Sequence, residues 1–137
     1  MGLISDDDRA RFRDRYIVSG APALLAAETE ALGSDYQANG YTTVAEADEL
    51  GRVLDVGLGQ VLVDVGAGCG WPGLYLATKH GCTVVGVDPV AEGCGVAERR
   101  AFTDGLAERA WAVRGNAIAL QVRAASVDAV VHTDLLC

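Results

Sequence analysis

The sequence has few of the features that mark metal-binding, secreted or membrane proteins. Its four cysteines, Cys69, Cys82, Cys94 and Cys137, include no Cys-x-x-Cys pair, and its two histidines stand far apart, so neither a zinc site nor a disulfide framework is indicated. No apolar run approaches the roughly 20 residues of a membrane helix, and the N-terminus does not resemble a signal peptide. We therefore expect a cytoplasmic protein with no metal and no membrane partner, whose cysteines are buried, reduced thiols.

Basic residues are also scarce. Lys and Arg number 11 against 19 Asp and Glu, which gives a net charge of -8 and a pI near 4.5. Such a surface disfavours attraction to phosphate backbones, so nucleic acid is not expected as a partner. Half of the 137 residues are hydrophobic, which is enough for one domain with its own core.

Residues 1–56 carry three helix signals and no strand signal. Ser5 precedes an acidic first turn, Pro22 and Gly33 suit the start and end of a second helix, and Thr43 with Glu46 forms a capping box for a third. The expected helices cover residues 5–20, 21–32 and 43–54. We expect residues 1–56 to form a helical cap.

From residue 57 onward, short β-branched runs alternate with helical segments. The expected strands are 60–65, 83–87, 109–113 and 127–132, and the expected helices are 71–80 and 89–103. This alternation predicts an α/β fold with a Rossmann-like parallel sheet in residues 57–137. In such a sheet the ligand site lies beyond the carboxyl ends of the strands.

The strongest motif, Asp64-Val-Gly66-Ala-Gly68-Cys-Gly70, lies between the first strand and the next helix. Glycines there let the backbone turn sharply and approach a ligand closely, while the helix start offers free amide groups. Asp88 ends the second strand and should lie beside this loop, where its two oxygens could accept both hydroxyls of a ribose. The pattern indicates an adenosine-type ligand.

At these residues the sequence resembles the class I S-adenosylmethionine-dependent methyltransferases. The resemblance is carried by VLVDVGAGCGWPGLYLA (61–77), VVGVDP (84–89), GNAIAL (115–120) and SVDAVVHTDLL (126–136). It implies S-adenosyl-L-methionine as cofactor and methyl transfer to a small-molecule nucleophile. The donor is already activated, so such an enzyme mainly aligns the reactants, and no catalytic residue is assigned.

The resemblance also implies roles for the glycine loop. Asp64 and the backbone at Gly66 would hold the ammonium group of the ligand, and the loop from Ala67 through Gly68 to Gly70 would line its methionine portion. An alternative interpretation leaves Asp64 as a cap of the following turn, with the glycines serving tight packing.

The ribose and adenine would bind at the next two strand ends. By resemblance, Asp88 would bind the ribose, Pro89 would lie against the adenine, and Asn116 with the Ala117 amide would meet the adenine edge. Two alternatives remain open, because Asp88 could be a helix N-cap and Asn116 a turn former.

Two other classes of function compete with the methyltransferase. Gly68, Gly70 and Gly73 also satisfy the GxGxxG pattern of NAD(P)-dependent oxidoreductases. Against that function, Asp64 would put a negative charge near a pyrophosphate, and Trp71 would crowd the turn. The third alternative is a nucleotide-binding or interaction module without catalysis.

Several polar and aromatic side chains outside the motifs have two interpretations. His132 and Asp134 could face the acceptor, or His132 could fill a partly buried position. Tyr36 and Tyr41 could form part of a lid, although aromatic packing is favoured. His80 is expected to be a solvated residue at a helix end.

The resemblance implies about three further strands beyond the fourth, which predicts a sheet truncated after that strand. The fourth strand should lie beside the first, so that Val127, Ala129, Val130 and Val131 form an exposed edge. We expect self-association through this edge or marginal stability, and no methyl transfer by this chain alone.

Overall fold

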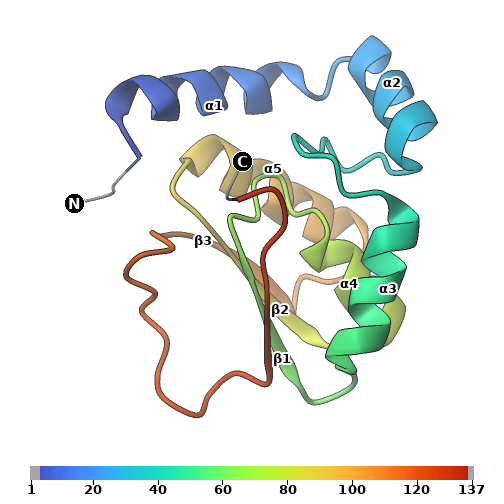
Figure 1. The fold of residues 1–137 in the computed structure, drawn as a ribbon, viewed down its shortest axis with the longest axis vertical. Coiled ribbons are helices and arrows are strands. Elements are labelled where there is room, and N and C mark those ends of the chain that lie inside the picture. Colours follow the sequence, from blue (N-terminus) through green and yellow to red (C-terminus); the bar gives the residue numbers. More distant parts are fainter. Residues whose placement is uncertain (1–3, 136–137) are drawn as a thin grey trace.

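The computed structural model describes residues 4–135. Its centre is a sheet of four parallel strands in the order β3-β2-β1-β4 (Figure 1). The strands are β1 (Val61–Val65), β2 (Thr83–Asp88), β3 (Ala110–Arg114) and β4 (Ala129–Val131). This order confirms the Rossmann-like α/β fold and the pairing of the fourth strand with the first. Leu136 and Cys137 of the predicted donor-binding portion lie outside the described residues.

Five helices accompany the sheet in the described part of the chain: α1 (Asp6–Val18), α2 (Pro22–Leu32), α3 (Val44–Leu54), α4 (Gly73–His80) and α5 (Ala91–Thr103). The capping signals of the first three helices are confirmed. The Ser5 side chain accepts the Asp8 N–H, Gly33 ends α2 in a left-handed conformation, and Thr43 with Glu46 forms the capping box.

Two predicted helix starts are wrong by two residues. Helix α4 begins at Gly73 rather than Trp71, because the Asp64 carboxylate accepts the Gly73 N–H and fixes the first helical residue there. Helix α5 begins at Ala91 rather than Pro89, because the turn after β2 is held by Asp88, which accepts the Val90 N–H.

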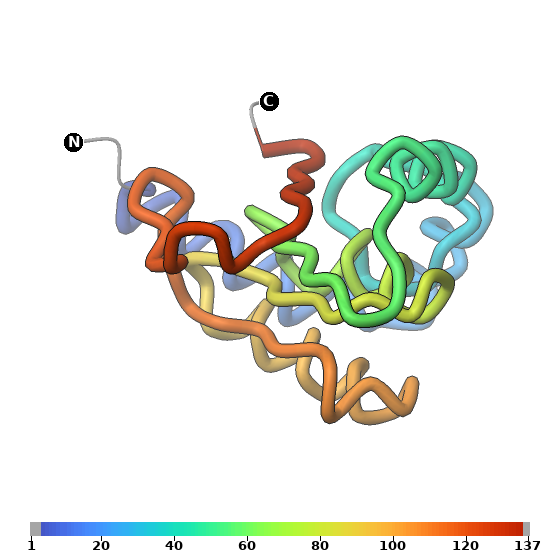
Figure 2. The backbone as a smooth tube through the Cα atoms, turned by 90° about the horizontal axis from the view of Figure 1, so that it is seen from below, coloured from blue at the N-terminus to red at the C-terminus, as the bar shows by residue number. Residues whose placement is uncertain are grey.

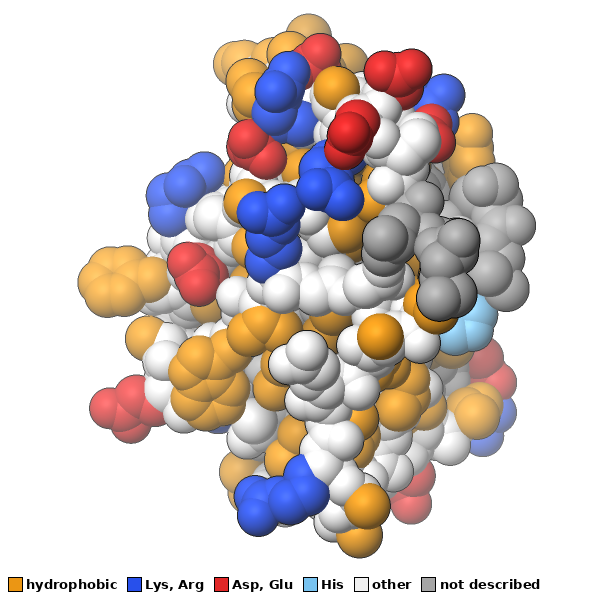
Figure 3. Space-filling model, turned by 90° about the vertical axis from the view of Figure 1, so that its left-hand side faces the viewer, with side chains coloured by type: hydrophobic (Ala, Val, Ile, Leu, Met, Phe, Trp, Pro, Cys, Tyr) orange, Lys and Arg blue, Asp and Glu red, His pale blue; other side chains and the backbone are white. Residues whose placement is uncertain are grey.

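The two faces of the sheet are covered differently. On one face, Leu62, Val84 and Val131 pack in the main core with residues of α4 and α5. On the other face, Val63, Val65 and Val87 form a smaller cluster with Val85 of β2 and with Leu120 and Val127, which come from the irregular segment that precedes β4. Figure 2 shows α5 and this segment on opposite sides of the strands. Hydrophobic side chains remain visible over much of the lower surface in Figure 3.

The exposed edge predicted at β4 is smaller than expected. The strand has three residues instead of six, because the chain before Ala129 turns away to cover the second face. Val131 is buried in the main core, whereas the Val130 side chain is 53% exposed. Within the described residues β4 pairs with β1 alone, so its outer side still offers open backbone groups.

We predict that Val130→Lys reduces self-association of the chain. A lysine on an edge strand opposes pairing with another strand because its charge would have to be desolvated. Sedimentation velocity over a range of protein concentrations measures this. Val53→Lys on α3, where the side chain is also exposed, is the matched control. Equal association of both variants and the parent chain would show that β4 is not the contact.

The cysteines and the helices of the described residues bear on two further expectations. Cys69, Cys82 and Cys94 are buried free thiols, as expected. Between residues 4 and 135, no helix is long and apolar enough to cross a membrane.

Candidate functional site

The glycine loop lies against the end of the neighbouring strand. Gly66, Gly68 and Gly70 have φ values of 74°, 53° and 106°, which L side chains rarely adopt. The N–H groups of Gly66 and Ala67 donate to the Val87 carbonyl at 2.8 and 3.1 Å. The loop is thereby fixed beside Asp88, as the sequence predicts.

Asp64 lies beneath the loop, on the face of the sheet that packs against α4. Its side chain is 1% exposed, and Oδ2 accepts the Gly73 N–H at 2.9 Å. Burial raises the pKa of Asp64 to about 8; the Gly73 hydrogen bond opposes this shift and the charge of Asp88 adds to it. This geometry supports the capping role, while contact with a ligand ammonium stays a prediction.

Gly73 is required by the Asp64 contact. A Cβ atom at position 73 would lie 2.6 Å from Asp64 Oδ2 and 3.0 Å from Asp64 Cβ. We predict that Gly73→Ala lowers the free energy of unfolding by about 1 to 3 kcal/mol, the usual cost of overpacking. Chemical denaturation measures this change.

Gly95→Ala on α5 is the matched control for the Gly73 variant. There a Cβ would meet only the Arg99 side chain, at 3.5 Å. Since alanine is the better helix former, this variant should gain about 0.5 to 1 kcal/mol. A Gly73→Ala protein as stable as the parent would contradict the packing described for Asp64.

Asp88 is almost fully buried and already holds several donors. Its side chain is 4% exposed. Oδ2 accepts the Gly68 N–H at 2.8 Å and Oδ1 accepts the Val90 N–H at 2.9 Å. Burial raises its pKa, and these two N–H groups and the Tyr16 hydroxyl oppose that shift.

Tyr16 is the site residue that the sequence did not reveal. Periodicity places Phe12 and Tyr16 on one face of α1, and they do pack together in a small cluster with Cys69 and Val90. Nothing in the sequence indicates, however, that this face lies on the glycine loop and Asp88.

The predicted adenine contacts gather near the end of β3. The Gly115 N–H donates to the Asp88 carbonyl at 3.0 Å, which brings the Asn116 region to the end of β2. Asn116 Oδ1 accepts the Ile118 N–H at 3.0 Å, so Asn116 forms a turn, and Ala117 is exposed. Pro89 is half-buried beside them. Their contact with adenine stays a prediction.

Two cavities lie along these strand ends. One of about 70 Å³ is lined by the loop from Gly66 to Cys69, with Tyr16 and Asp134 among its other walls. The other, of about 240 Å³, is lined by Pro89, Val90 and Arg114 together with residues of α1. Helix α1 therefore borders both cavities, and Figure 1 shows it crossing above the strand ends.

Two polar residues that follow β4, Asp134 and His132, lie in different surroundings. Asp134 Oδ2 accepts the Thr42 hydroxyl at 2.9 Å and the Tyr41 N–H at 3.0 Å, and so holds residues 41–42 beside the smaller cavity. His132 is exposed and lines neither cavity, so the interpretation that it fills a buried position is wrong.

Aromatic packing is confirmed for one of the two tyrosines, because the Tyr36 ring lies 5.3 Å from that of Trp71, while Tyr41 is 80% exposed. His80 ends α4, as expected, but it is half-buried rather than fully solvated. Its Nε2 atom is buried, since Gly51 leaves room for the imidazole against α3.

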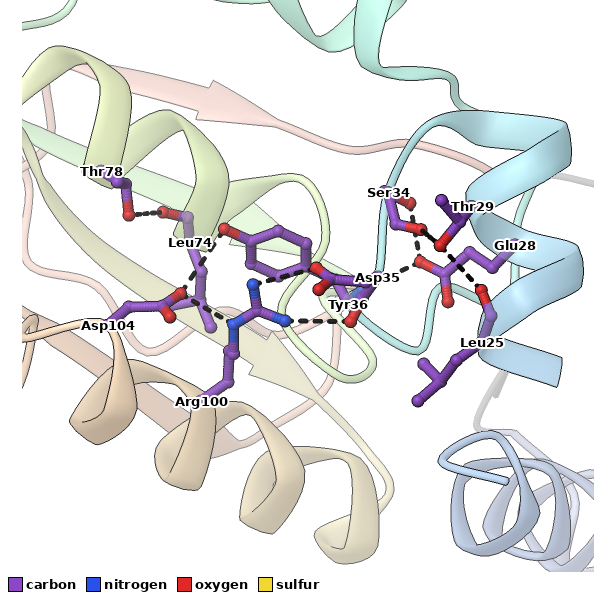
Figure 4. A network of polar contacts seen from close by, with 10 residues as sticks. All are labelled: Leu25, Glu28, Thr29, Ser34, Asp35, Tyr36, Leu74, Thr78, Arg100 and Asp104. Atoms are coloured by element: carbon purple, nitrogen blue, oxygen red, sulfur yellow. Dashed lines mark hydrogen bonds and ion pairs between the residues drawn. The ribbon is translucent and has the colours of Figure 1, made fainter. Parts of the chain in front are cut away.

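A polar network ties the segment between α2 and α3 to α5. The Arg100 guanidinium lies 3.8 Å from the Tyr36 ring centre and bonds to Asp104 at 2.8 Å and to Asp35 (Figure 4). Glu28 on α2 accepts the Tyr36 N–H at 2.9 Å. These contacts fix α2 relative to α5.

The geometry defines a Rossmann-like site with a glycine loop and a carboxylate at the next strand end. Residues 62–137 match the model of a family described as a methyltransferase domain. Because this match covers more than half of the chain, the protein belongs to that family. A comparison with curated proteins finds no match.

Solved structures of methyltransferases share the fold. A S-adenosylmethionine-dependent methyltransferase from Thiobacillus denitrificans, in complex with S-adenosyl-L-homocysteine, is 27% identical with a TM-score of 0.60, over 67% of this chain and 37% of that one. A geranyl diphosphate methyltransferase in complex with S-adenosylmethionine is 26% identical with a TM-score of 0.65, over 85% of this chain and 46% of that one.

A third solved structure bears on the expected absence of nucleic acid. An RNA methyltransferase from Salinibacter ruber is 23% identical with a TM-score of 0.60, over 66% of this chain and 58% of that one. This likeness shows the fold alone. The chain spans less than two thirds of each of these three proteins.

Proposed function

We propose that this chain binds S-adenosyl-L-methionine and serves methyl transfer to a small-molecule nucleophile. The observation that carries the proposal is the contact between Asp88 Oδ2 and the Gly68 N–H at 2.8 Å. This contact joins the Asp88 carboxylate, which would bind the ribose, to a glycine loop at the carboxyl ends of adjacent parallel strands. That edge is where Rossmann-like sheets bind ligands.

Each part of the donor has a partner of suitable chemistry. The donor combines a zwitterion, a diol and an adenine. A carboxylate and backbone amides suit the zwitterion, a second carboxylate suits the diol, and an amide edge suits the adenine. Asp64 and Gly66 would hold the ammonium group, and residues 67–70 would line the methionine portion. The second oxygen of Asp64, Oδ1, is buried without a hydrogen-bond partner among the described residues, so one acceptor remains for this purpose.

The ribose and adenine would lie toward β2 and β3. Asp88 would bind the ribose, Pro89 would lie against the adenine, and Asn116 with the Ala117 amide would meet its edge. The bound donor supplies a methyl group already activated by the sulfonium. The residues of this chain therefore serve to orient the donor and to exclude water.

A small-molecule acceptor fits the charge of the chain and the residues beside the loop. The net charge of -8 disfavours nucleic acid. One similar structure is that of a geranyl diphosphate methyltransferase, which acts on a small molecule. Residues 41–42, held by Asp134 at the smaller cavity, would border the acceptor.

Isothermal titration calorimetry with S-adenosylhomocysteine and NAD tests the proposed function. We expect the sulfur ligand to bind more tightly, because its ammonium group would favour loss of the Asp64 proton and pair with the carboxylate, whereas a pyrophosphate would oppose that charge. Tighter binding of NAD would instead support an oxidoreductase. Binding of S-adenosylhomocysteine by a longer protein that transfers no methyl group would support the non-catalytic module.

A further inference from the structure

The cavity of about 240 Å³ lies directly beside the carboxylate that would bind the ribose. Pro89 and Val90 line this cavity, and the Val90 N–H donates to Asp88 Oδ1 at 2.9 Å. The adenine of the donor is attached to its ribose. With the ribose on Asp88, the base would therefore lie in or next to this cavity.

A larger cavity continues from this one along α1 and α5. It has a volume of about 500 Å³ and shares Ala91 and Glu92 with the 240 Å³ cavity and Tyr16 with the 70 Å³ cavity at the glycine loop. The connected space leaves room for a ligand that needs roughly 300 Å³ or more. Of these three cavities, only the one of 240 Å³ is lined by Pro89 and Val90, so it is the place for the adenine.

Helix α1 provides a second wall of the 240 Å³ cavity. Asp6, Arg9, Ala10 and Arg13 line it, and their spacings of three and four residues place them on one face of the helix. Figure 1 shows α1 crossing above the strand ends. The cavity therefore lies between this face of α1 and the turn that follows β2.

The walls of this cavity carry hydrogen-bond donors and acceptors together. Arg9, Arg13 and Arg114 supply donors, and Asp6 and Glu92 supply acceptors. The two carboxylates oppose a phosphate, and the three guanidinium groups oppose a cation. An adenine base suits such walls, because it has both acceptors and a donor but no net charge.

Among the arginines of the cavity, Arg9 has a donor without an acceptor. Its Nε atom is buried and has no hydrogen-bond partner in the described part of the chain. In contrast, Arg13 is paired with Asp14 at 3.1 Å, and Arg114 Nε donates to the Pro89 carbonyl at 3.3 Å. A buried N–H without an acceptor destabilises a fold, and a ring nitrogen of adenine is an acceptor that would satisfy it.

We propose that Arg9 binds the adenine of the donor, with its Nε–H group donating to a ring nitrogen of the base. Helix α1 is then part of the donor site, and Arg9 favours a ligand whose base offers an acceptor. This inference rests on the proposed donor site at Asp88 and the glycine loop, to which it adds a residue from the N-terminal helix.

Calorimetric titration of the chain and of Arg9→Met with S-adenosylhomocysteine tests the contact. Methionine keeps an unbranched side chain and has no N–H group, so the variant should bind about tenfold more weakly, the scale of one hydrogen bond from a charged group. Arg11→Met removes the same charge from the same helix. Because the Arg11 side chain is 63% exposed and pairs with Asp8, this control should bind like the parent.

A ligand without the amino-acid end shows which part of the donor Arg9 meets. Arg9→Met should weaken the binding of 5′-methylthioadenosine, measured in the same way, by the same factor, because both ligands carry the same base. A loss for S-adenosylhomocysteine alone would mean that Arg9 meets the carboxylate of the ligand, and it overturns the adenine contact. Equal binding of both ligands by Arg9→Met and the parent overturns it too.

Chemical denaturation separates contact with the ligand from a role in folding. Since Arg9 Nε has no partner in the fold, Arg9→Met should be at least as stable as the parent chain. A variant that unfolds at lower denaturant concentration and binds more weakly in proportion would make Arg9 a structural residue and overturn the contact.

Hydrogen exchange of the parent chain gives a test that needs no variant. Addition of S-adenosylhomocysteine should slow exchange in residues 6–18 together with residues 66–70. Slower exchange in residues 66–70 with unchanged or faster exchange in residues 6–18 would overturn the role of α1 and leave the donor site intact. No binding heat and no change in residues 66–70 would overturn the donor site and, with it, the contact of Arg9.

Discussion

Replacement of Asp64 by asparagine is expected to stabilise the folded chain at alkaline pH and to weaken donor binding. The pKa of Asp64 in the folded chain is about 8, against an ordinary value of 3.8, because the carboxyl is buried. Asparagine has nearly the same shape and can still accept the Gly73 N–H, but it has no charge to bury.

The direction of the pH dependence follows from the raised pKa. Between about pH 4 and 8 the folded chain keeps a proton on Asp64 that the unfolded chain releases. The stabilisation is therefore complete below about pH 4 and is lost as pH rises to about 8, at up to about 1.4 kcal/mol per pH unit. Asp64→Asn should lack this loss, so it should match the parent at about pH 4 and exceed it increasingly up to about pH 8.

Urea denaturation at about pH 4, 6 and 8 measures these stabilities. The control is Asp128→Asn at the opposite end of β1, where the side chain is exposed and accepts the Val61 N–H. Calorimetry with S-adenosylhomocysteine then separates the two roles of Asp64. If the carboxylate holds the ammonium group, the variant binds at least about tenfold more weakly, a difference of about 1.4 kcal/mol. Equal binding would leave Asp64 only as the residue that fixes the start of α4.

Asp88→Ala is expected to weaken donor binding by about 1.5 to 3 kcal/mol, the scale of hydrogen bonds to a charged acceptor. From the sequence alone this substitution should hardly affect folding. The structure changes that expectation, because the Gly68 and Val90 N–H groups lose their acceptor in a buried position. We expect a loss of about 1 to 3 kcal/mol in the free energy of unfolding as well.

The control for Asp88→Ala is Asp128→Ala, which also removes a carboxylate that accepts a backbone N–H, here that of Val61 at 2.7 Å. It lies at the amino end of the sheet, so it should lower stability without changing donor affinity. Calorimetry and denaturation of both proteins give the comparison. An Asp88→Ala protein that melts lower yet binds S-adenosylhomocysteine like the parent would leave Asp88 with a structural role only.

The order of elements was predictable because each signal is local. The capping box at Thr43 and Glu46 needs only four consecutive residues. The strand at Val61–Val65 is indicated by its β-branched run and the glycines that follow. The length of β4 was not predictable in the same way. Whether residues 127 and 128 join the strand depends on the contact of Val127 with Val63 and Val65 on the second face.

The parts of the site that lie at the ends of the strands were predictable. The proximity of Asp88 to the glycine loop follows from parallel strands and the connection between them. The position of Tyr16 does not, because it depends on how α1 packs. The glycine at position 93, which looks like a weakness in α5, is explained by the same contact, since a Cβ there would meet the Tyr16 ring.

The central claim is that the glycine loop and Asp88 together form a donor site, and an NMR titration tests it most directly. With the chain labelled with ¹⁵N, S-adenosylhomocysteine should shift the amide signals of residues 66–70, 88–90 and 115–117, and the signals of residues 44–54 on α3 should stay in place. Shifts confined to other segments, or no shifts at saturating ligand, would contradict the claim.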